Sequence, residues 1–195
     1  FGYRDYENKI LNNENTLFAI GSCTKAFTSS LLGLLRDKGK LDFEDSPIDY
    51  VKELRFYNGN LNEIISIRDL MSHRTGIPRH DLSWYFFPTF SKDSLIKRIE
   101  YHKPFTTIRN KYWYNNFMFL VQGVIAERIT GESWEENIRE MIFEPLEMKR
   151  SNLSIAEMEK EENALIKCQG DDHKLWTNCT GSYKAATGHK YEGIF

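Results

Sequence analysis

The spacing of the apolar residues changes at Gly21, and this change constrains the fold more than any other feature of the sequence. Residues 16–20 form a short apolar run that is typical of an extended segment. Over residues 22–38 the apolar positions instead recur every three or four residues, which predicts an amphipathic helix that begins at Ser22. Gly39 then stands where a helix commonly ends. The chain is therefore expected to pass from a strand through a glycine into a helix.

Four further segments combine helical spacing with start or stop residues, and they are residues 67–73, 92–102, 116–130 and 134–144. Ser66 with Asp69, and Ser133 with Glu136, have the spacing of a capping box. A strand over residues 1–8 with a turn at Asn12-Asn13 is expected near the start. These elements predict a single α+β domain over residues 1–195, in which residues 156–195 form a tail of unassigned structure.

The charge pattern argues against a nucleic-acid partner. The 26 basic and 28 acidic residues are mixed along the chain, so no basic stripe is available to neutralise phosphates. The longest apolar run, residues 117–121, falls far short of the roughly 20 residues that a membrane span needs. Three cysteines argue against a disulfide framework, although Cys168 and Cys179 could pair.

Ser22-Cys-Thr-Lys25 is the strongest candidate for chemistry. Residues three apart on a helix share one face, so the Lys25 amine can reach the Ser22 hydroxyl. A lysine amine is protonated in water at neutral pH, but burial and the positive end of a helix dipole favour its neutral, basic form. The spacing therefore indicates a nucleophilic Ser22 with Lys25 as its base, and the Ser22 backbone N–H as one oxyanion donor.

The same pattern occurs a second time, at Ser94-Leu-Ile-Lys97. That copy lies within a short amphipathic segment, where Lys97 is expected to point to water. Only the first copy lies where an extended segment passes through a glycine into a helix, which is the arrangement that presents a nucleophile at the end of a sheet. The context, rather than the pattern, favours Ser22.

Tyr114-Asn-Asn116, directly before the apolar segment 116–130, is the second candidate. A tyrosine phenol can relay protons between a nucleophile and a leaving group, and an asparagine amide can hold a substrate carbonyl and a lysine amine. The alternative makes Tyr114 a packed aromatic residue and Asn116 a helix cap. The same pattern at Tyr6-Glu-Asn8 shows that it also arises by chance.

A metal site is not expected. His73, His80 and Asp81 are separated by a helix end and a Gly-Ile-Pro turn, so they lack the usual ligand spacing. We expect neither a metal nor an organic cofactor.

Taken together, several segments resemble the superfamily of class C β-lactamases, penicillin-binding proteins and related esterases. In order along this chain they are residues 16–28 around Ser22, Gly39-Lys-Leu-Asp-Phe-Glu-Asp45, Ile67-Arg-Asp-Leu-Met-Ser-His73-Arg-Thr-Gly76-Ile-Pro78, Tyr114-Asn-Asn116 and Ile142-Phe-Glu-Pro145-Leu-Glu-Met148. The resemblance covers roughly residues 1–155. It implies a β-lactamase/DD-peptidase-like α+β fold, with an antiparallel sheet flanked by helices and a helical lobe.

By position, the resemblance implies that Ser22 attacks a carbonyl to form an acyl-enzyme. Lys25 would take the Ser22 proton, Tyr114 would act as partner base and as acid for the leaving group, and Asn116 would orient the substrate. The implied reaction is hydrolysis of a β-lactam, a D-peptide or a carboxylic ester, with a small molecule or a peptide as the substrate. Which of Lys25 and Tyr114 is the base stays open, and the relatives imply a periplasmic or secreted location.

The family's third motif, Lys-Thr-Gly or His-x-Gly on a strand, has no clear counterpart. The nearest candidate, Thr187-Gly188-His189-Lys190, has the wrong order and position. We therefore expect a fold that is incomplete at both ends, as in a fragment or a shortened protein. An inactive relative that serves as a binding or structural module is the alternative, and covalent labelling distinguishes it because only the enzyme needs an activated Ser22.

Overall fold

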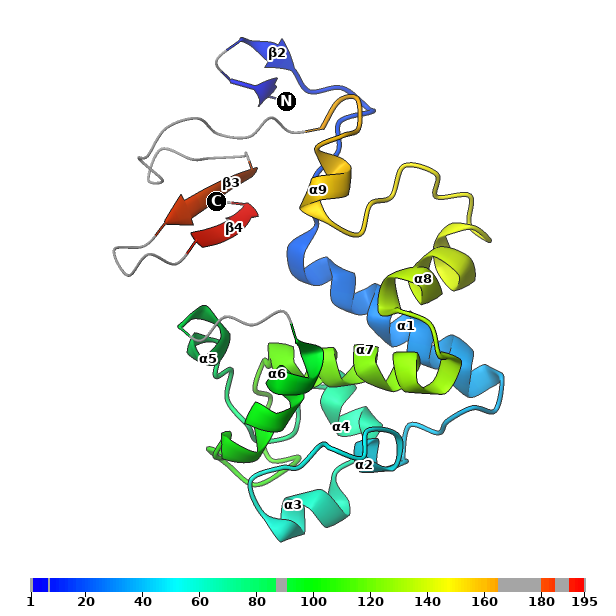
Figure 1. The fold of residues 1–195 in the computed structure, drawn as a ribbon, viewed down its shortest axis with the longest axis vertical. Coiled ribbons are helices and arrows are strands. Elements are labelled where there is room, and N and C mark those ends of the chain that lie inside the picture. Colours follow the sequence, from blue (N-terminus) through cyan, green and yellow to red (C-terminus); the bar gives the residue numbers. More distant parts are fainter. Residues whose placement is uncertain (1, 7, 87–90, 165–179, 185–189, 195) are drawn as a thin grey trace. The chain divides into compact units, whose positions relative to one another are not determined.

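The computed structural model describes residues 2–6, 8–86, 91–164, 180–184 and 190–194. The chain forms two compact units (Figure 1). Residues 22–149 form the first, here called the helical unit, and residues 1–21 with 150–195 form the second, here called the terminal unit. Each is described by itself.

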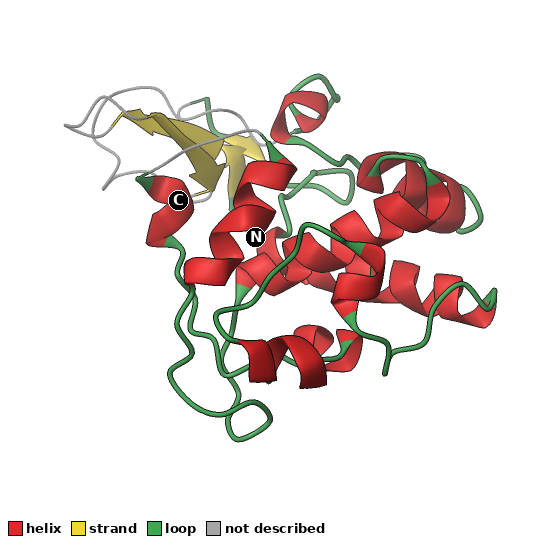
Figure 2. Ribbon diagram, turned by 60° about the horizontal axis from the view of Figure 1, so that its bottom comes forward, coloured by secondary structure: helices red, strands yellow, loops and turns green. Residues whose placement is uncertain are grey.

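The helical unit contains helices joined by loops. Its elements are the end of the 3-10 turn η1 (Gly21–Cys23), α1 (Thr24–Asp37), α2 (Pro47–Tyr50), α3 (Gly59–Ile64), α4 (Ile67–Met71), α5 (Leu82–Tyr85), α6 (Lys92–Arg98), the 3-10 turn η2 (Ile99–Tyr101), α7 (Asn116–Thr130), α8 (Trp134–Ile138) and the π-helical turn η3 (Arg139–Phe143). In Figure 2 the described part of this unit is drawn as helix and loop, without a strand.

The core of the helical unit forms around α7. This helix packs against α1, α2, α4, α6 and α8. Its fully buried side chains include Phe117, Met118, Val121 and Ile125, which lie on more than one face of the helix. A helix that is apolar nearly all round belongs in the interior, with the amphipathic helices placed about it. This central position fixes the start of α7, where Tyr114 and Asn116 stand.

The start and stop residues predicted from the sequence are largely confirmed. The capping boxes of Ser66 with Asp69 and of Ser133 with Glu136 are both present. Gly131 ends α7 in the left-handed conformation, with φ +83°. The cap of α7 is Asn115 rather than Asn116, since the Asn115 side chain accepts a hydrogen bond from the Met118 N–H at 3.3 Å.

The prediction that the first helix begins at Ser22 is wrong by two residues. Ser22 lies in η1, and α1 begins at Thr24 with Cys23 as a cap residue whose side chain makes no capping bond. The helix ends near Gly39 as expected, where φ is +66°. Since Ser22 does not cap the helix, its hydroxyl is available for other partners.

The terminal unit contains the described strands. They are β1 (Tyr3–Asp5) with β2 (Ile10–Leu11), and β3 (Thr180–Lys184) with β4 (Lys190–Ile194), each pair antiparallel. The short helix α9 (Ile155–Met158) belongs to the same unit. Leu17 forms a parallel bridge with Ala164, and its N–H donates to the Asn163 carbonyl at 3.1 Å.

Two predictions for this unit need correction. The chain reverses between Asp5 and Ile10 instead of at Asn12-Asn13, with Lys9 at φ +57°. Of the run 16–20, Leu17 alone forms a β-bridge within the described residues. A two-strand hairpin also lies in the tail that the sequence pattern left unassigned. Cys168, Cys179 and residues 187–189 lie outside the described residues.

None of the helices in the described residues has both the length and the apolar character needed to cross a lipid bilayer.

Candidate active site

The structure brings Ser22, Lys25 and Tyr114 together. The Lys25 Nζ donates to the Ser22 Oγ at 3.3 Å, and the Tyr114 hydroxyl donates to the same Oγ at 2.5 Å. Ser22 is exposed and Lys25 is half-buried. A serine oxygen that accepts from two potential proton carriers, and that solvent can reach, has the arrangement expected of an activated nucleophile.

The charges around Tyr114 favour its ionised form. Burial raises the pKa of the phenol, but hydrogen bonds with Lys25 and Ser22 and the positive charges of Lys25 and Arg79 outweigh it, so the pKa lies below its ordinary value. The Lys25 Nζ lies 4.7 Å from the ring centroid of Tyr114. A phenol that loses its proton more easily is better suited to act as a base near neutral pH.

Asn116 follows Tyr114 by two residues. It is the first residue of α7, and its Nδ2 donates to the Asp81 Oδ1 at 3.3 Å. No hydrogen bond from Asn116 to Ser22 or Lys25 occurs in the described part of the chain. The structure therefore places Asn116 near the site through its position next to Asn115 and through Asp81.

Tyr114 is held in place by the loop that follows α4. The His73 carbonyl accepts from the Trp113 N–H at 2.8 Å, and the His73 Nδ1 accepts from the Asn115 N–H at 3.1 Å. The ring of His73 packs against that of Tyr114, with centroids 4.6 Å apart. The residues on both sides of Tyr114 are thus fixed to one histidine, which orients the phenol.

His73 must be neutral to play this role, because a protonated Nδ1 could not accept a hydrogen bond. Burial, together with the positive charge of Lys25, lowers the pKa of His73 to about 4. The side chain is therefore neutral at pH 7. Its backbone has φ +56°, a left-handed conformation that costs energy for a residue other than glycine.

Asn115 extends the same connection. It is fully buried, and its Nδ2 donates to the carbonyls of Ile77 at 3.2 Å and Pro78 at 2.7 Å. One side chain therefore caps α7 and ties the start of that helix to the Gly-Ile-Pro turn.

A close backbone contact fixes the segment before Tyr114. Gly76 has φ +78°, and a Cβ atom at this position would lie 2.3 Å from the Thr106 carbonyl oxygen. The Gly76 carbonyl accepts from the Phe105 N–H at 2.9 Å. Only glycine combines this backbone conformation with so close an approach.

An ion pair between Arg109 and Asp69 also holds the segment before Tyr114. The buried carboxylate of Asp69 accepts from the Arg109 Nε at 2.9 Å and from a terminal guanidinium nitrogen at 2.8 Å. Asp69 also accepts from the Ser66 N–H at 3.0 Å as part of the capping box of α4. The segment from Ile67 to Pro78, which has no residue in the Ser22 group, thus serves to position Tyr114.

The second Ser-x-x-Lys pattern forms no comparable group. The Ser94 N–H donates to the Ser91 Oγ at 3.2 Å, in the first turn of α6, and Lys97 is exposed as predicted. No hydrogen bond joins Ser94 and Lys97 within the described residues. The two copies of the pattern are therefore distinguished by the presence of Tyr114 beside Ser22.

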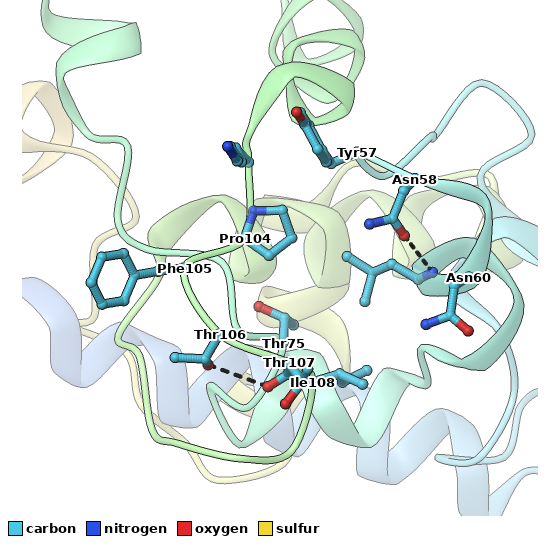
Figure 3. Close-up of a pocket in the computed structure, with 11 residues that line it drawn as sticks. Tyr57, Asn58, Asn60, Thr75, Pro104, Phe105, Thr106, Thr107 and Ile108 are labelled. Atoms are coloured by element: carbon cyan, nitrogen blue, oxygen red, sulfur yellow. Dashed lines mark hydrogen bonds between the residues drawn. The ribbon is translucent and has the colours of Figure 1, made fainter.

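A cavity of about 500 Å³ lies elsewhere in the helical unit (Figure 3). It lies between the start of α3 and the segment 103–108, and its lining includes Tyr57, Asn58, Thr75 and Phe105. None of the candidate catalytic side chains lines it. Among the described residues, no cluster of three His, Cys, Asp or Glu side chains could hold a metal ion.

The sequence predicts Ser22, Lys25, Tyr114 and Asn116 as site residues, but no pattern in it assigns a role in the site to Asn115 or Arg79. His73 and Asp81 were expected neither to bind a metal nor to take part in the site. Their contacts join positions about 40 residues apart, which no local pattern reveals. The available signal was the resemblance of the segment Ile67 to Pro78, which the sequence links to the family although it contains none of the predicted catalytic residues.

Comparison with known proteins identifies relatives of this arrangement. The chain is 33% identical over 153 residues to the unguisins hydrolase ungD′ of Aspergillus campestris (strain IBT 28561), an alignment that covers 72% of this chain and 28% of the relative. It is 29% identical over 151 residues to the teichoic acid D-alanine hydrolase of Staphylococcus aureus (strain MRSA252), covering 77% of this chain and 36% of that protein. The chain thus spans about a third of the length of these relatives.

The fold has counterparts among solved structures. The octameric penicillin-binding protein homologue from Pyrococcus abyssi matches with a TM-score of 0.73 at 23% identity, over 100% of this chain and 43% of that one. This likeness shows the β-lactamase/DD-peptidase-like fold, of which the chain covers a part. The model of the family described as Beta-lactamase matches residues 1–177. The chain belongs to the β-lactamase family.

Proposed function

We propose that this chain carries the nucleophile segment of a serine hydrolase, which cleaves an amide or an ester through an acyl-enzyme on Ser22. The observation that carries the proposal is the pair of hydrogen bonds at the Ser22 Oγ, from Lys25 at 3.3 Å and from Tyr114 at 2.5 Å. The relatives named above are hydrolases, which supports the same reaction class.

The proposed reaction begins when the phenol of Tyr114 loses its proton to solvent, which the positive charge of Lys25 favours, so that the hydrogen bond reverses and the Ser22 hydroxyl donates to the phenolate. Tyr114 takes the hydroxyl proton of Ser22 while the Oγ forms a bond to the substrate carbonyl carbon. The bond to the leaving group then breaks, and the proton passes from Tyr114 to that group. Water hydrolyses the Ser22 ester by the same steps in reverse order. The lowered pKa of Tyr114 supports its role as the base, and Lys25 would stabilise the phenolate.

Asn116 is proposed as the substrate-binding residue. It lies two positions after Tyr114 at the start of α7, where the Asn115 cap and the central position of the helix fix the backbone. An amide so placed can donate to the substrate carbonyl once its hydrogen bond to Asp81 is exchanged.

We further propose that the two units belong to one β-lactamase-type domain, because the family match runs through residues of both. The substrate is proposed to be a small molecule or a peptide. This rests on the names of the relatives, one a hydrolase of unguisins and one of teichoic acid D-alanine.

Turnover of a nitrophenyl ester and of a chromogenic cephalosporin tests the proposal. We expect the wild type to hydrolyse at least one of them, Ser22→Ala to fall to the background rate, and Ser94→Ala to stay within about twofold of the wild type. Activity on the ester alone would assign the chain to the esterase side of the family. A Ser22→Ala variant as active as the wild type would refute the proposal, and an inactive but folded wild type would favour a binding role.

A further inference from the structure

Arg79 places a second positive charge against Tyr114. Its guanidinium carbon lies 5.1 Å from the centroid of the Tyr114 ring. Its side chain is 60% exposed, so the charge faces solvent at the edge of the Ser22 group. The mechanism proposed above gives this arginine no step.

The position of Arg79 is fixed from both sides. The preceding residue, Pro78, is held at its carbonyl by the buried Asn115 at 2.7 Å. The Arg79 Nε donates to the Asp81 Oδ2 at 2.6 Å, while the other carboxylate oxygen of Asp81 holds Asn116. Arg79 is therefore built into the network that positions the start of α7, unlike an ordinary surface arginine, whose side chain moves freely.

The ion pair with Asp81 leaves part of the guanidinium available. A guanidinium has N–H groups on three nitrogens, and in the described residues Asp81 is bound by the Nε alone. The Asp81 side chain is only 14% exposed, so its negative charge lies behind the arginine as seen from solvent. Since no other hydrogen bond of this guanidinium occurs among the described residues, its terminal nitrogens can bind a planar anion from the solvent side, which is the geometry that arginine recognises best.

We propose that Arg79 is a specificity-determining residue that binds a carboxylate of the substrate. The preferred substrates would be esters or amides with an acidic group a few bonds away from the scissile carbonyl. Lys25 and Arg79 are both within 5.1 Å of the Tyr114 ring centroid. Lys25 faces the phenol oxygen through Ser22, whereas Arg79 is 60% exposed, so Arg79 is the cation that an approaching anion meets from solvent. This inference rests on the proposed function, since it names the substrate class for the same site.

A matched pair of esters tests the inference. The probes are 4-nitrophenyl valerate, which is neutral, and mono-4-nitrophenyl glutarate, which has nearly the same length and a terminal carboxylate. Since Arg79 also contacts Tyr114 and Asp81, Arg79→Gln is expected to lower the rates with both esters, but we expect kcat/KM to fall about fivefold to tenfold more with the glutarate ester than with the valerate ester. Arg79→Glu is expected to lower the glutarate rate further, because it adds repulsion.

Arg36 offers a control variant with the same kinds of contact. The Arg36 Nε pairs with Asp42 at 3.4 Å, and the Arg36 guanidinium lies 5.0 Å from the ring centroid of Phe43. Among the described residues, Arg36 takes part in none of the contacts that define the site. Arg36→Gln should leave both rates unchanged. An equal loss with both esters in Arg79→Gln would overturn the inference, because it would mean that Arg79 acts on Tyr114 instead of on the substrate. Rates that do not depend on Arg79 at all would also overturn it.

Binding measured without turnover separates this inference from the proposed function. Glutarate is titrated into the Ser22→Ala variant by NMR, with and without Arg79→Gln. Weakening of glutarate binding by about fivefold or more in the double variant supports the role of Arg79 even if neither ester is hydrolysed. Equal binding to the two variants would contradict it, whereas loss of ester turnover alone would count against the proposed function.

Discussion

Tyr114 is the side chain through which the residues of the site are connected. Its hydroxyl donates to Ser22, its ring packs on His73, and Lys25 and Arg79 place positive charge at the ring. A single side chain therefore combines the proton-transfer group with the contacts that orient it. The hydroxyl and the ring of Tyr114 thus have different contacts, so a substitution can remove the one and keep the other.

Tyr114→Phe removes the hydroxyl and keeps the ring against His73. We expect the ester hydrolysis rate to fall by about 100-fold or more, because general acid–base groups contribute on that scale, with little change in stability. Tyr112→Phe is the control, since Tyr112 also packs on His73, with centroids 5.4 Å apart, but is 65% exposed and makes no hydrogen bond to Ser22 among the described residues. Full activity in Tyr114→Phe, measured as kcat on the better ester, would remove Tyr114 from the proposed mechanism.

At the residue scale the sequence could predict the reactive side chains but not their support. Ser22 and Lys25 lie three positions apart, and this local spacing is visible in the sequence. The pattern at Ser94 has identical spacing, and only the presence of Tyr114, 92 residues away from Ser22, distinguishes them. His73 and Asn115 meet across 42 residues, a contact that depends on packing.

At the element scale, the loop after α4 and the segment 105–115 act as one support for Tyr114. Gly76→Ala tests this coupling, since a Cβ would lie 2.3 Å from the Thr106 carbonyl oxygen and φ is +78°. We expect the free energy of unfolding to fall by about 2–4 kcal/mol and ester turnover to fall with it, as Tyr114 shifts. Urea denaturation and the ester assay on the folded fraction measure the two effects.

Gly33→Ala is the matched control for that substitution. Gly33 lies within α1, and no atom lies within 4 Å of a Cβ built there. Since alanine favours a helix interior over glycine, we expect a gain of about 0.5–1 kcal/mol in stability and unchanged turnover. Equal effects at Gly33 and Gly76 would show that the Thr106 contact is unimportant.

Helices with local start and stop residues were predictable, whereas the strands were not. The capping boxes at Ser66 and Ser133 satisfy backbone groups within one turn, so the sequence alone reveals them. The reversal between β1 and β2 instead uses Lys9 at φ +57°, a conformation that sequence does not favour for lysine. Leu17 pairs with Ala164, a contact set by tertiary structure and not by the apolar run itself.

At the scale of the whole molecule, buried histidines link stability to pH. His102 is 4% exposed, and neither of its ring nitrogens has a hydrogen-bond partner among the described residues. Burial, with the charges of His80 and Arg98, lowers its pKa to about 4. The unfolded chain binds a proton near pH 6.5, which the folded chain resists, so stability is expected to fall as the pH falls from about 6.5 to 4.

His102→Phe should reduce this pH dependence. Phenylalanine keeps the packing against His80 and Phe117, whose ring centroids lie 4.4 and 4.5 Å from that of His102, and it has no proton to bind. We expect the loss of unfolding free energy between pH 7 and pH 4.5 to be smaller in the variant, by up to about 3 kcal/mol. Because Asp69 and His73 titrate in both proteins, the difference reports His102 together with its interaction with His80. If the free energy of unfolding depended on pH in the same way in both proteins, His102 would bind a proton as readily in the folded chain as in the unfolded chain, which would contradict this prediction.

The family match extends to residue 177, further than the motif-based resemblance, which ended near residue 155. The last motif of the resemblance ends at Met148, so a resemblance based on motifs could not extend as far as the family match. The hairpin of β3 and β4 illustrates this, because its strands carry Gly, Ser, Lys and Tyr without a regular apolar alternation. The helical unit was therefore more predictable than the terminal unit.

The most direct test of a nucleophilic Ser22 is the intact mass of the protein after incubation with a fluorophosphonate. We expect one adduct on the wild type and on Ser94→Ala, and none on Ser22→Ala. Peptide mapping should place that adduct within residues 22–25. An adduct that persists in Ser22→Ala, or no adduct on folded wild type, would contradict the central claim that Lys25 and Tyr114 activate this serine.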